Sequence, residues 1–494
     1  MKKYIYIPLF ILLVALSSCS DYLEREPSFS LNEENGVTNF SKAEAAVGGV
    51  YETFIDSDQW SGQYYTDLAS RSGFIKWRSA EYNMEYAEGN ETTSSIRYRW
   101  SYFYKSLNSA NFAIEGISNL SDAQVPSEEE RNSLLGQARC LRAWININLL
   151  WNYGHWWSDD YDNPNGLLYR DQVVNLGNIE KARISVGESY DKIFEDLDYA
   201  IANLGSFKSS RYVSKEFAKV LKAKILLYRG GMNDNASDLQ ESLGLVNEVL
   251  NTSVSGFSMQ DDLAKVYKDS WDSEENLFSR YLEEGNRTYK SYYYSNNITT
   301  RYADKLPRDE DQITAKLNFG SDWFKADPRW DIVTGDVHSP ASWDTNRYYT
   351  WTKVVRLAQY DGVLEGDEKY NTYYFRYPEL YIMKSELLAR TGASTAEAIA
   401  PINLMRSKRT NPVLPSLTVN SQQELMDTIF KEYFLETFLE NGSEYYASLR
   451  FKTAGEPWIV AIKNGKILDK NKLCYPIPEE EMEFNKLMTQ NIDL

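Results

Sequence analysis

The stretch WSGQYYTDLASRSGFIKWR, residues 60–78, mixes large aromatic side chains with charged ones. Flat aromatic rings pack against the C–H faces of sugar rings, while charged and amide side chains hydrogen-bond the ring hydroxyls. If exposed, such a cluster predicts a platform for a neutral glycan, and the same residue types would also suit a peptide. For any single residue, packing in the core beside the first helix is the competing interpretation. The candidate ligand contacts in this stretch are Trp60, Tyr64, Asp67, Arg71, Trp77 and Arg78.

Groups for covalent or metal chemistry are sparse. The chain has two histidines, His155 and His338, and it carries no HExxH, paired CxxC, GxSxG or Walker-type motif. We therefore expect no zinc site, no Cys/His nucleophile and no cofactor. A glycosidase needs only two carboxylates, but acidic side chains are mostly a solvated surface. Acidic residues near Asp162 and at 309–311 could bind calcium, although neither segment has EF-hand spacing and ordinary turns explain them better.

The amino-terminal residues match a bacterial lipoprotein signal peptide. Two lysines precede an apolar run at residues 5–16, which is shorter than the roughly 20 residues that span a bilayer. The sequence LSSC at residues 16–19 is a lipobox. Removal of residues 1–18 would leave Cys19 as the first residue, carrying acyl chains that anchor the protein to a membrane. Residues 19–40 are polar and are interpreted as a tether.

Length and charge narrow the functional class. The 494 residues can bury a large core, and the 43% hydrophobic content is that of a globular protein. A net charge of −18 argues against nucleic-acid binding, because no basic excess is available to neutralise phosphates. The three cysteines do not form a disulfide framework. A bridge between Cys140 and Cys474 is left open.

Helical periodicity dominates most of the chain. The expected helices cover residues 41–55, 100–118, 129–151, 190–204, 214–231, 238–250, 375–391 and 394–409. Ser214 is a plausible N-cap, and the Gly230-Gly231 pair should end its helix. Ser394 and Glu397 form a capping-box pattern, and Pro401 should kink the helix that follows.

Periodicity fails between about residues 253 and 372, where Tyr, Trp, Asp, Asn and Ser are frequent. Long loops inside a compact domain are usually functional. We expect a mainly α fold in which helical hairpins of tetratricopeptide (TPR) size form a scaffold at 41–252 and 373–452. An irregular lobe at 253–372 and a carboxy-terminal segment at 453–494 complete one domain, 41–494.

Several short motifs follow one another in a fixed order. Arg139, Arg142 and Ala143 form an R-x-x-R-A helix that leads to a Tyr153-Gly154 turn. Further motifs lie in YDKIFEDLDYAIANL, SKEFAKVLKAKILLYRG, SEENLFSRYLE, DPRWD, YFRYPELYIMKSELLARTG and YPIPEEEMEFNKLMTQN. Together with the lipobox, this order resembles the SusD/RagB family of nutrient-binding outer-membrane lipoproteins over nearly the whole mature chain. One motif departs from the family pattern: Glu432, Glu436 and Glu440 are kept, but Tyr433 replaces an arginine and Ser448 an aspartate.

The resemblance implies a scaffold of four TPR-like hairpins and a SusC-like TonB-dependent transporter as partner. It implies ligand capture and handover without bond chemistry, on the surface of a Gram-negative outer membrane. In relatives the ligand site comes from segments that correspond to Trp60–Trp100 and Tyr292–Trp351, which adds Trp100, Tyr293 and Trp343 as candidate contacts. Glycan capture is the first hypothesis, peptide capture by the same architecture the second, and a lipoprotein glycoside hydrolase the third.

Overall fold

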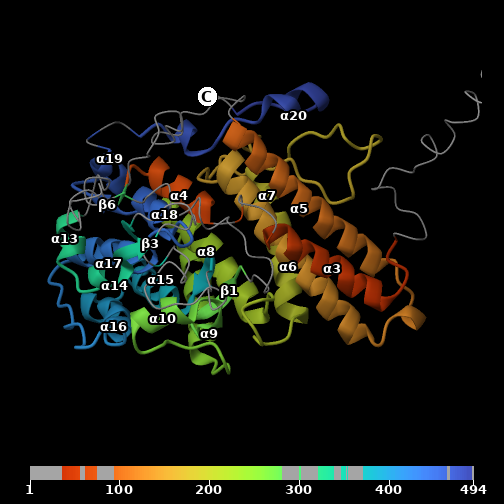
Figure 1. Cartoon of the computed structure of the whole chain (residues 1–494). Coiled ribbons are helices and arrows are strands. Elements are labelled where there is room, and N and C mark those ends of the chain that lie inside the picture. Colours follow the sequence, from red (N-terminus) through yellow and green to blue (C-terminus); the bar gives the residue numbers. More distant parts are fainter. Residues whose placement is uncertain are drawn as a thin grey trace, which may run out of the picture.

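The computed structural model describes residues 36–55, 60, 62–74, 94–280, 300–301, 321–338, 347–351, 353, 371–463, 465 and 468–491. Helices dominate these residues and the strands are short, as Figure 1 shows. The mainly α prediction is therefore confirmed. The signal peptide, Cys19 and most of the tether lie outside the described residues.

The scaffold is a series of long helices, each packed on the next. It consists of α3 (Phe40–Ile55), α5 (Ser94–Ser118), α6 (Glu128–Tyr153), α7 (Val186–Asn203), α8 (Lys215–Asn233), α9 (Ala236–Asn251), α15 (Tyr377–Arg390) and α16 (Thr395–Arg406). Successive helices contact each other as hairpin partners, α3 with α5, α6 with α7, α8 with α9, and α15 with α16, and α5 with α6 and α7 with α8 are also in contact. Helix α15 also packs on α9, so the series continues across the irregular part of the chain.

Local sequence signals set most helix boundaries. Ser185 with Glu188 and Ser394 with Glu397 form capping boxes at the starts of α7 and α16, and Ser214 caps α8. Pro401 lies inside α16 as predicted. The predicted end of α8 at the glycine pair is wrong, because the helix continues to Asn233. A Cβ on Gly230 would lie 2.9 Å from Asp238 Cβ of α9, so this glycine serves close helix packing instead.

Short helices and strands make up the described residues of the part between α9 and β5 (Tyr373–Arg376). They are α10 (Leu263–Asp269), η5 (Ser270–Asp272), β1 (Asn276–Ser279), β2 (Thr300–Arg301), α13 (Ser321–Lys325), α14 (Trp330–Val333), β3 (Thr334–His338) and β4 (Arg347–Trp351). The strand order β2-β4-β3 is antiparallel. Strand β1 pairs antiparallel with β5, which leads directly into α15. This pairing attaches the beginning of the irregular part to its end.

The remaining elements complete the two ends of the domain. Helix α4 (Gly62–Arg71) follows α3, and η4 (Asp122–Gln124) precedes α6. The carboxy-terminal part contains α17 (Gln422–Thr437), α18 (Ser443–Arg450), β6 (Lys452–Thr453), β7 (Glu456–Pro457), α19 (Trp458–Ile462), η8 (Lys470–Leu473) and α20 (Glu479–Phe484).

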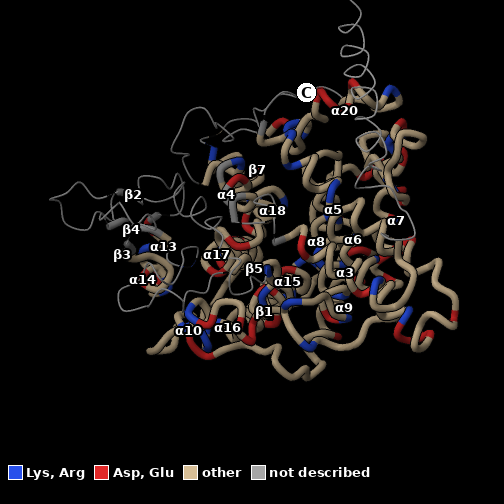
Figure 2. Tube along the Cα trace, turned by 45° about the vertical axis from the view of Figure 1, so that its right-hand side comes forward, with Lys and Arg blue, Asp and Glu red and all other residues tan. Residues whose placement is uncertain are grey.

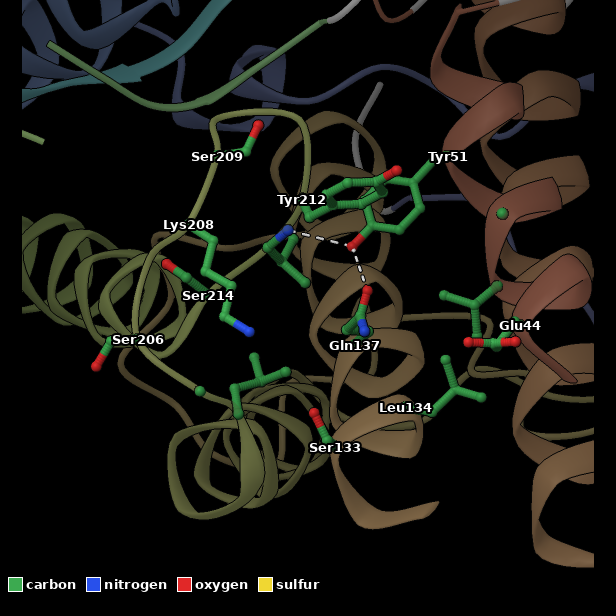
Figure 3. Close-up of a pocket in the computed structure, with 15 residues that line it drawn as sticks. Glu44, Tyr51, Ser133, Leu134, Gln137, Ser206, Lys208, Ser209, Tyr212 and Ser214 are labelled. Atoms are coloured by element: carbon green, nitrogen blue, oxygen red, sulfur yellow. Dashed lines mark hydrogen bonds between the residues drawn. The ribbon is translucent and has the colours of Figure 1, made fainter. Parts of the chain in front are cut away.

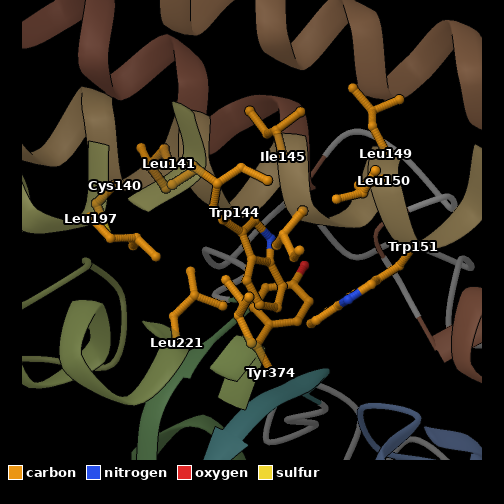
Figure 4. Packing of buried hydrophobic residues seen from close by; sticks show 14 of the residues in the cluster. Cys140, Leu141, Trp144, Ile145, Leu149, Leu150, Trp151, Leu197, Leu221 and Tyr374 are labelled. Carbon is orange, nitrogen blue, oxygen red and sulfur yellow. The ribbon is translucent and has the colours of Figure 1, made fainter. Parts of the chain in front are cut away.

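The largest hydrophobic cluster is centred on α6. Figure 4 shows Trp144 projecting from α6 between Leu221 of α8 and Tyr374 of β5. The Trp144 ring lies 5.4 Å from the Tyr374 ring, centroid to centroid, and is 5% exposed. Rings at such distances add favourable contact energy to the burial itself. The core therefore joins the amino-terminal helices to β5 far along the chain.

Buried charges join the irregular part to α17, and Figure 2 shows both signs gathered where β1, β5, α15 and α17 meet. Glu432 accepts from Arg329, and Glu440 accepts from Arg376 with an Nε–Oε2 distance of 2.8 Å. Glu436 lies within salt-bridge distance of Arg329 and Arg376. The three kept glutamates thus bind arginines from other motifs, although Tyr433 has replaced an arginine and bonds Glu386 instead.

Candidate functional site

Five predicted ligand contacts lie in the interior, which corrects the expectation of an exposed platform made of them. The exposed fractions are 0% for Trp60, 1% for Tyr64, 3% for Asp67, 2% for Arg71 and 7% for Trp100. Their faces are covered by other side chains of the protein. The core-packing interpretation is therefore the one that describes these five residues.

Aromatic contacts fill the space around Trp60 and Tyr64. The Trp60 ring stacks on Phe103 at 4.3 Å and meets Phe54 edge-on, and its indole N–H donates to Ser106 Oγ. The Tyr64 hydroxyl accepts from Asn152 Nδ2 of α6 at 2.7 Å. Both rings therefore fasten α4 and the turn before it to the helical scaffold.

The charged members of the stretch are paired inside the protein. Asp67 of α4 accepts from Arg99 of α5. Arg71 donates to the Leu473 carbonyl oxygen at 2.7 Å, and its guanidinium lies 4.2 Å from the centre of the Tyr475 ring. The Trp100 indole N–H donates to Glu481 of α20 at 3.3 Å. These contacts hold the carboxy-terminal segment against α4 and α5.

The other four candidates are not placed. Trp77, Arg78, Tyr293 and Trp343 lie outside the described residues, as does Cys19, the predicted site of lipid attachment. A role for these four in ligand contact stays a prediction.

A surface cavity elsewhere combines the features that the sequence suggested for a ligand site. We call it the Tyr212 hollow: it is formed by residues 44–51 of α3, residues 133–137 of α6 and the loop at 204–214, and has a volume of about 400 Å³. Figure 3 shows its side chains converging from these three parts of the chain. Its polar side chains include Glu44, Ser133, Gln137, Ser206, Lys208 and Ser209.

Tyr212 supplies an exposed aromatic ring at the rim of the hollow. Its exposed fraction is 45%, and its ring meets Tyr51 of α3 edge-on with centroids 5.3 Å apart. A second cavity of about 70 Å³ lies on the Arg211 side and shares Gly48, Tyr51 and Tyr212 with the first. The two tyrosines therefore stand between two hollows.

The loop that carries Tyr212 is held at both ends and in the middle. Lys215 N donates to the Gly205 carbonyl oxygen at 3.0 Å, and Phe207 N donates to buried Glu216 at 2.6 Å. The Phe207 ring is buried against Phe257. Ser279 N of β1 donates to the Ser210 carbonyl oxygen at 3.0 Å. These bonds preorganise the loop, so that little ordering is left for a ligand to impose.

The Tyr51 hydroxyl links the loop to the scaffold. It donates to Gln137 Oε1 at 3.1 Å and accepts from Val213 N at 3.1 Å. Burial raises the pKa of Tyr51 above its ordinary value of 10.0, so the hydroxyl stays protonated and keeps its donor role. The Gln137 amide N–H₂ is left for other partners.

Two opposite charges line the hollow. Lys208 and Glu44 are exposed, and neither has an ion-pair partner among the described residues. A donor cation and an acceptor anion with hydroxyl and amide groups suit a polar ligand without net charge, because each ligand hydroxyl both donates and accepts. The hollow is thus equipped for noncovalent recognition.

The two described cysteines are not placed for nucleophilic chemistry. Cys140 and Cys474 are both buried and unpaired, and burial raises the pKa of the Cys474 thiol to about 12. Among the described residues no cluster of three or more His, Cys, Asp or Glu could hold a metal ion. In the same part of the chain, no helix has the length and apolar content needed to cross a membrane.

Two features of the sequence could have indicated the Tyr212 hollow. One is the Gly48-Gly49 pair inside α3, where a Cβ on either residue would meet nothing within 4 Å. The other is a tyrosine in the loop GSFKSSRYVS, a short segment rich in serine between two capped helices. Tertiary packing brings the glycine pair and the tyrosine close to Gln137, and the sequence does not show this contact.

Comparisons with known proteins find related families over residues 21–226 and 231–493. Residues 21–226 match the family described as "Starch-binding associating with outer membrane", and residues 231–493 match the SusD family. Two SusD-like proteins of Formosa agariphila, P38 and P2, are 24% and 23% identical, and the alignments cover 100% and 92% of both chains.

Solved structures share the fold at low identity. A laminarin-binding SusD-like protein has a TM-score of 0.66 at 19% identity, with 92% of this chain and 100% of that one covered. A SusD superfamily protein from Parabacteroides distasonis has a TM-score of 0.70 at 16% identity, with 94% and 100% covered. The matches over the two parts of the chain, and the paired helices that carry their motifs, show that this protein belongs to the SusD family.

Proposed function

We propose that this protein captures a glycan at the cell surface and passes it to a SusC-like TonB-dependent transporter without breaking bonds. The observation that carries the proposal is a preorganised hollow with an exposed tyrosine, amide and hydroxyl groups in a chain of the SusD family. A laminarin-binding protein is among the structural neighbours. The lipobox at Cys19 would tether the protein to the outer membrane beside its transporter.

The hollow favours binding over hydrolysis. Glu44 lines the Tyr212 hollow, and Glu52 lines the smaller cavity beside it. Both carboxylates are exposed, and the two residues are eight positions apart on α3. Their Cα atoms are therefore about 12 Å apart along the helix axis. Glycosidase carboxyl groups face each other across the scissile bond in one cleft, about 5–10 Å apart, whereas Glu44 and Glu52 line different cavities.

The candidate contacts that lie outside the described residues would form a ligand-binding region of their own. Trp77, Arg78, Tyr293 and Trp343 are the remaining candidates from the segments that form the ligand site in relatives. Aromatic and charged side chains of this kind would stack on sugar rings and bond their hydroxyls. The buried residues Trp60, Tyr64, Asp67, Arg71 and Trp100 would support these segments from below.

The test is a screen of the soluble form that lacks residues 1–19 against polysaccharides in affinity gels and on a glycan array. A peptide pool is screened beside them. Saturable retardation by one polysaccharide class, with the polymer recovered at its original length, supports glycan capture. Shortened product identifies a hydrolase, and binding to peptides alone moves the protein to the second hypothesis.

Delivery needs a separate measurement. Co-purification from detergent-solubilised outer membranes with a TonB-dependent barrel, followed by uptake of the labelled glycan in cells with and without this protein, tests it. Uptake that does not depend on this protein at limiting glycan concentration would contradict the handover.

A further inference from the structure

We propose that the Tyr212 hollow is a glycan-binding site in its own right, for uncharged pyranose residues, separate from the segments 60–100 and 292–351. Among the described residues, none from those segments lines the Tyr212 hollow or the smaller cavity beside it. The inference rests on the proposed function in one respect, that the ligand is a glycan. It assigns a second contact point on the amino-terminal helices of the scaffold.

The size of the larger cavity suits a sugar unit of an oligosaccharide. Its volume of about 400 Å³ lies within the range of small-molecule pockets, about 300–1,000 Å³. The neighbouring cavity of about 70 Å³ is too small for a ring but can take a substituent. Since both cavities share Tyr51 and Tyr212, a chain that lies across the tyrosine pair reaches both.

Tyr212 is held in a fixed orientation by neighbouring side chains, with the Arg211 guanidinium 5.5 Å from its ring centre. The edge-on contact with Tyr51 orients the ring, and Tyr51 is itself fixed by Gln137 and Val213 N. Nearly half of the Tyr212 surface stays exposed although a partner ring is present. A preorganised aromatic face binds at small entropic cost, because its side chain has few rotatable bonds left to order.

The polar groups indicate an uncharged ligand. Lys208 can donate to sugar hydroxyls, Glu44 can accept from them, and the Gln137 amide and the serine hydroxyls can do both. The charges of Lys208 and Glu44 cancel within the larger cavity. An anionic uronate or sulfate in this cavity would be attracted by Lys208 and repelled by Glu44, whereas the hydroxyl groups of an uncharged ring can bond to both.

Gly48 keeps the floor of the hollow open. Glycine inside a helix is unfavourable relative to alanine, yet a Cβ on Gly48 would meet no protein atom within 4 Å. Packing within the protein therefore does not require glycine here. Gly48 lines both cavities, and Gly49 beside it lines neither, which makes Gly49 a matched control.

The first experiment compares Tyr212→Ala with the unaltered protein and with Tyr161→Ala, which removes a tyrosine that is 53% exposed and lies outside the hollow. Maltoheptaose, laminarihexaose, cellohexaose and xylohexaose are titrated by calorimetry, with an oligogalacturonate as the charged probe. For the sugar that binds, Tyr212→Ala should lose one of two sites or weaken binding about 3- to 10-fold. Tyr161→Ala should bind like the unaltered protein, and 0.5 M NaCl should leave the affinity unchanged, since screening acts on charged partners.

The second experiment uses Gly48→Leu and Gly49→Leu. Gly48→Leu should fold, with a melting temperature no lower than that of the unaltered protein, and should weaken binding several-fold. Gly49→Leu should leave binding unchanged. Hydrogen exchange over residues 205–213 should slow when the sugar is added to the unaltered protein.

The outcomes separate this site from the proposed function. Binding that is unchanged in Tyr212→Ala and Gly48→Leu, with no protection at 205–213, would overturn the site while glycan capture stands. Affinity for the oligogalacturonate alone, lost in 0.5 M NaCl, would overturn the uncharged class. Failure of the unaltered protein to bind any glycan would overturn the site and the proposed function together.

Discussion

Arg142 of α6 and Asp196 of α7 are joined by two hydrogen bonds inside the scaffold. Arg142 Nε lies 2.7 Å from Asp196 Oδ2, and Arg142 Nη2 lies 2.8 Å from Asp196 Oδ1. Arg139 donates to the same carboxylate at 2.6 Å. Asp196 is 1% exposed. The R-x-x-R-A motif and Asp196 of the YDKIFEDLDYAIANL motif therefore form one buried ion cluster that fixes α6 against α7.

Removing the shared carboxylate should strongly destabilise the protein. Asp196→Ala leaves Arg142 buried without its charged partner, which typically lowers the free energy of unfolding by about 3–5 kcal/mol. Urea unfolding followed by circular dichroism measures this change. Asp198→Ala, two residues further on α7, is the control: its carboxylate is 58% exposed where it pairs with Lys222, so we expect a loss of about 1 kcal/mol or less. Equal losses would refute the distinction.

Glycine replacements in the helices should have opposite effects at different positions. Gly48→Ala and Gly49→Ala should each raise the free energy of unfolding by about 0.5–1 kcal/mol, since helix propensity improves and nothing is in the way. Gly116→Ala of α5 should lower it, because a Cβ there would lie 2.4 Å from Val37 Cγ2. Chemical denaturation of the three variants checks both signs.

The buried carboxyl group of Glu444 should make stability depend on pH. Burial raises its pKa from an ordinary value of 4.5 to about 7, and its Oε2 atom has no hydrogen-bond partner in the described part of the chain. Between these values the folded state holds a proton that the unfolded chain releases, so the free energy of unfolding falls as the pH rises through this window. The loss is complete above about pH 7.

Glu444→Gln should remove that dependence. The variant should be more stable than the unaltered protein at pH 8, by an amount on the order of 1–3 kcal/mol, and the difference should shrink towards pH 5. Thermal unfolding at a series of pH values measures it. A difference that stayed constant from pH 5 to pH 8 would show that Glu444 does not titrate in this range.

Much of the fold followed from the sequence because its signals are local. The helix predicted at 190–204 and the capping box at Ser394 depend on residues within one or two turns, and the structure contains both. The buried positions of the candidate glycan-binding residues could not be predicted from the sequence. Asp67 and Arg71 resemble exposed charges, but their partners Arg99 and Leu473 are 32 and 402 residues away. A single sequence does not show such contacts.

The Tyr212 hollow was unpredictable for the same reason. Gly48, Gln137 and Tyr212 come from three separate parts of the chain, and only the stacking of α3, α6 and α8 brings them together. Tyr212 itself gives no periodic signal, since it lies in a loop. Its exposure depends on the turn at 209–212, which the residue types in this loop do not predict.

Replacement of Cys19 tests the lipid anchor. Cys19→Ala removes the thiol that would carry an acyl chain and should release the protein from the membrane fraction, because several chains are needed for stable anchoring. Fractionation of cells that express either form, with detection in membrane and soluble fractions, measures the release. Continued membrane association of the variant would refute the lipobox.

Replacement of the two tryptophans from the predicted ligand segments tests their role. If either ring stacks on a sugar, Trp77→Ala or Trp343→Ala should weaken binding by about 1–3 kcal/mol. Affinity gels and calorimetry measure the change, and circular dichroism shows whether the variant has folded. Loss of folding would instead assign that ring to the core.

The ion pairs that Glu432, Glu436 and Glu440 make with Arg329 and Arg376 affect how this part of the sequence can evolve. Arg329 and Arg376 border a long segment of the irregular part, and both end on the carboxylates of 432, 436 and 440. The two attachment points lie close together in the sequence, at the end of α17 and just after it. Trp330, Trp351 and Lys353 of the interval between the arginines are buried and must keep their contacts. Exposed residues of the same interval can change during evolution without disturbing the ion cluster that holds both of its ends.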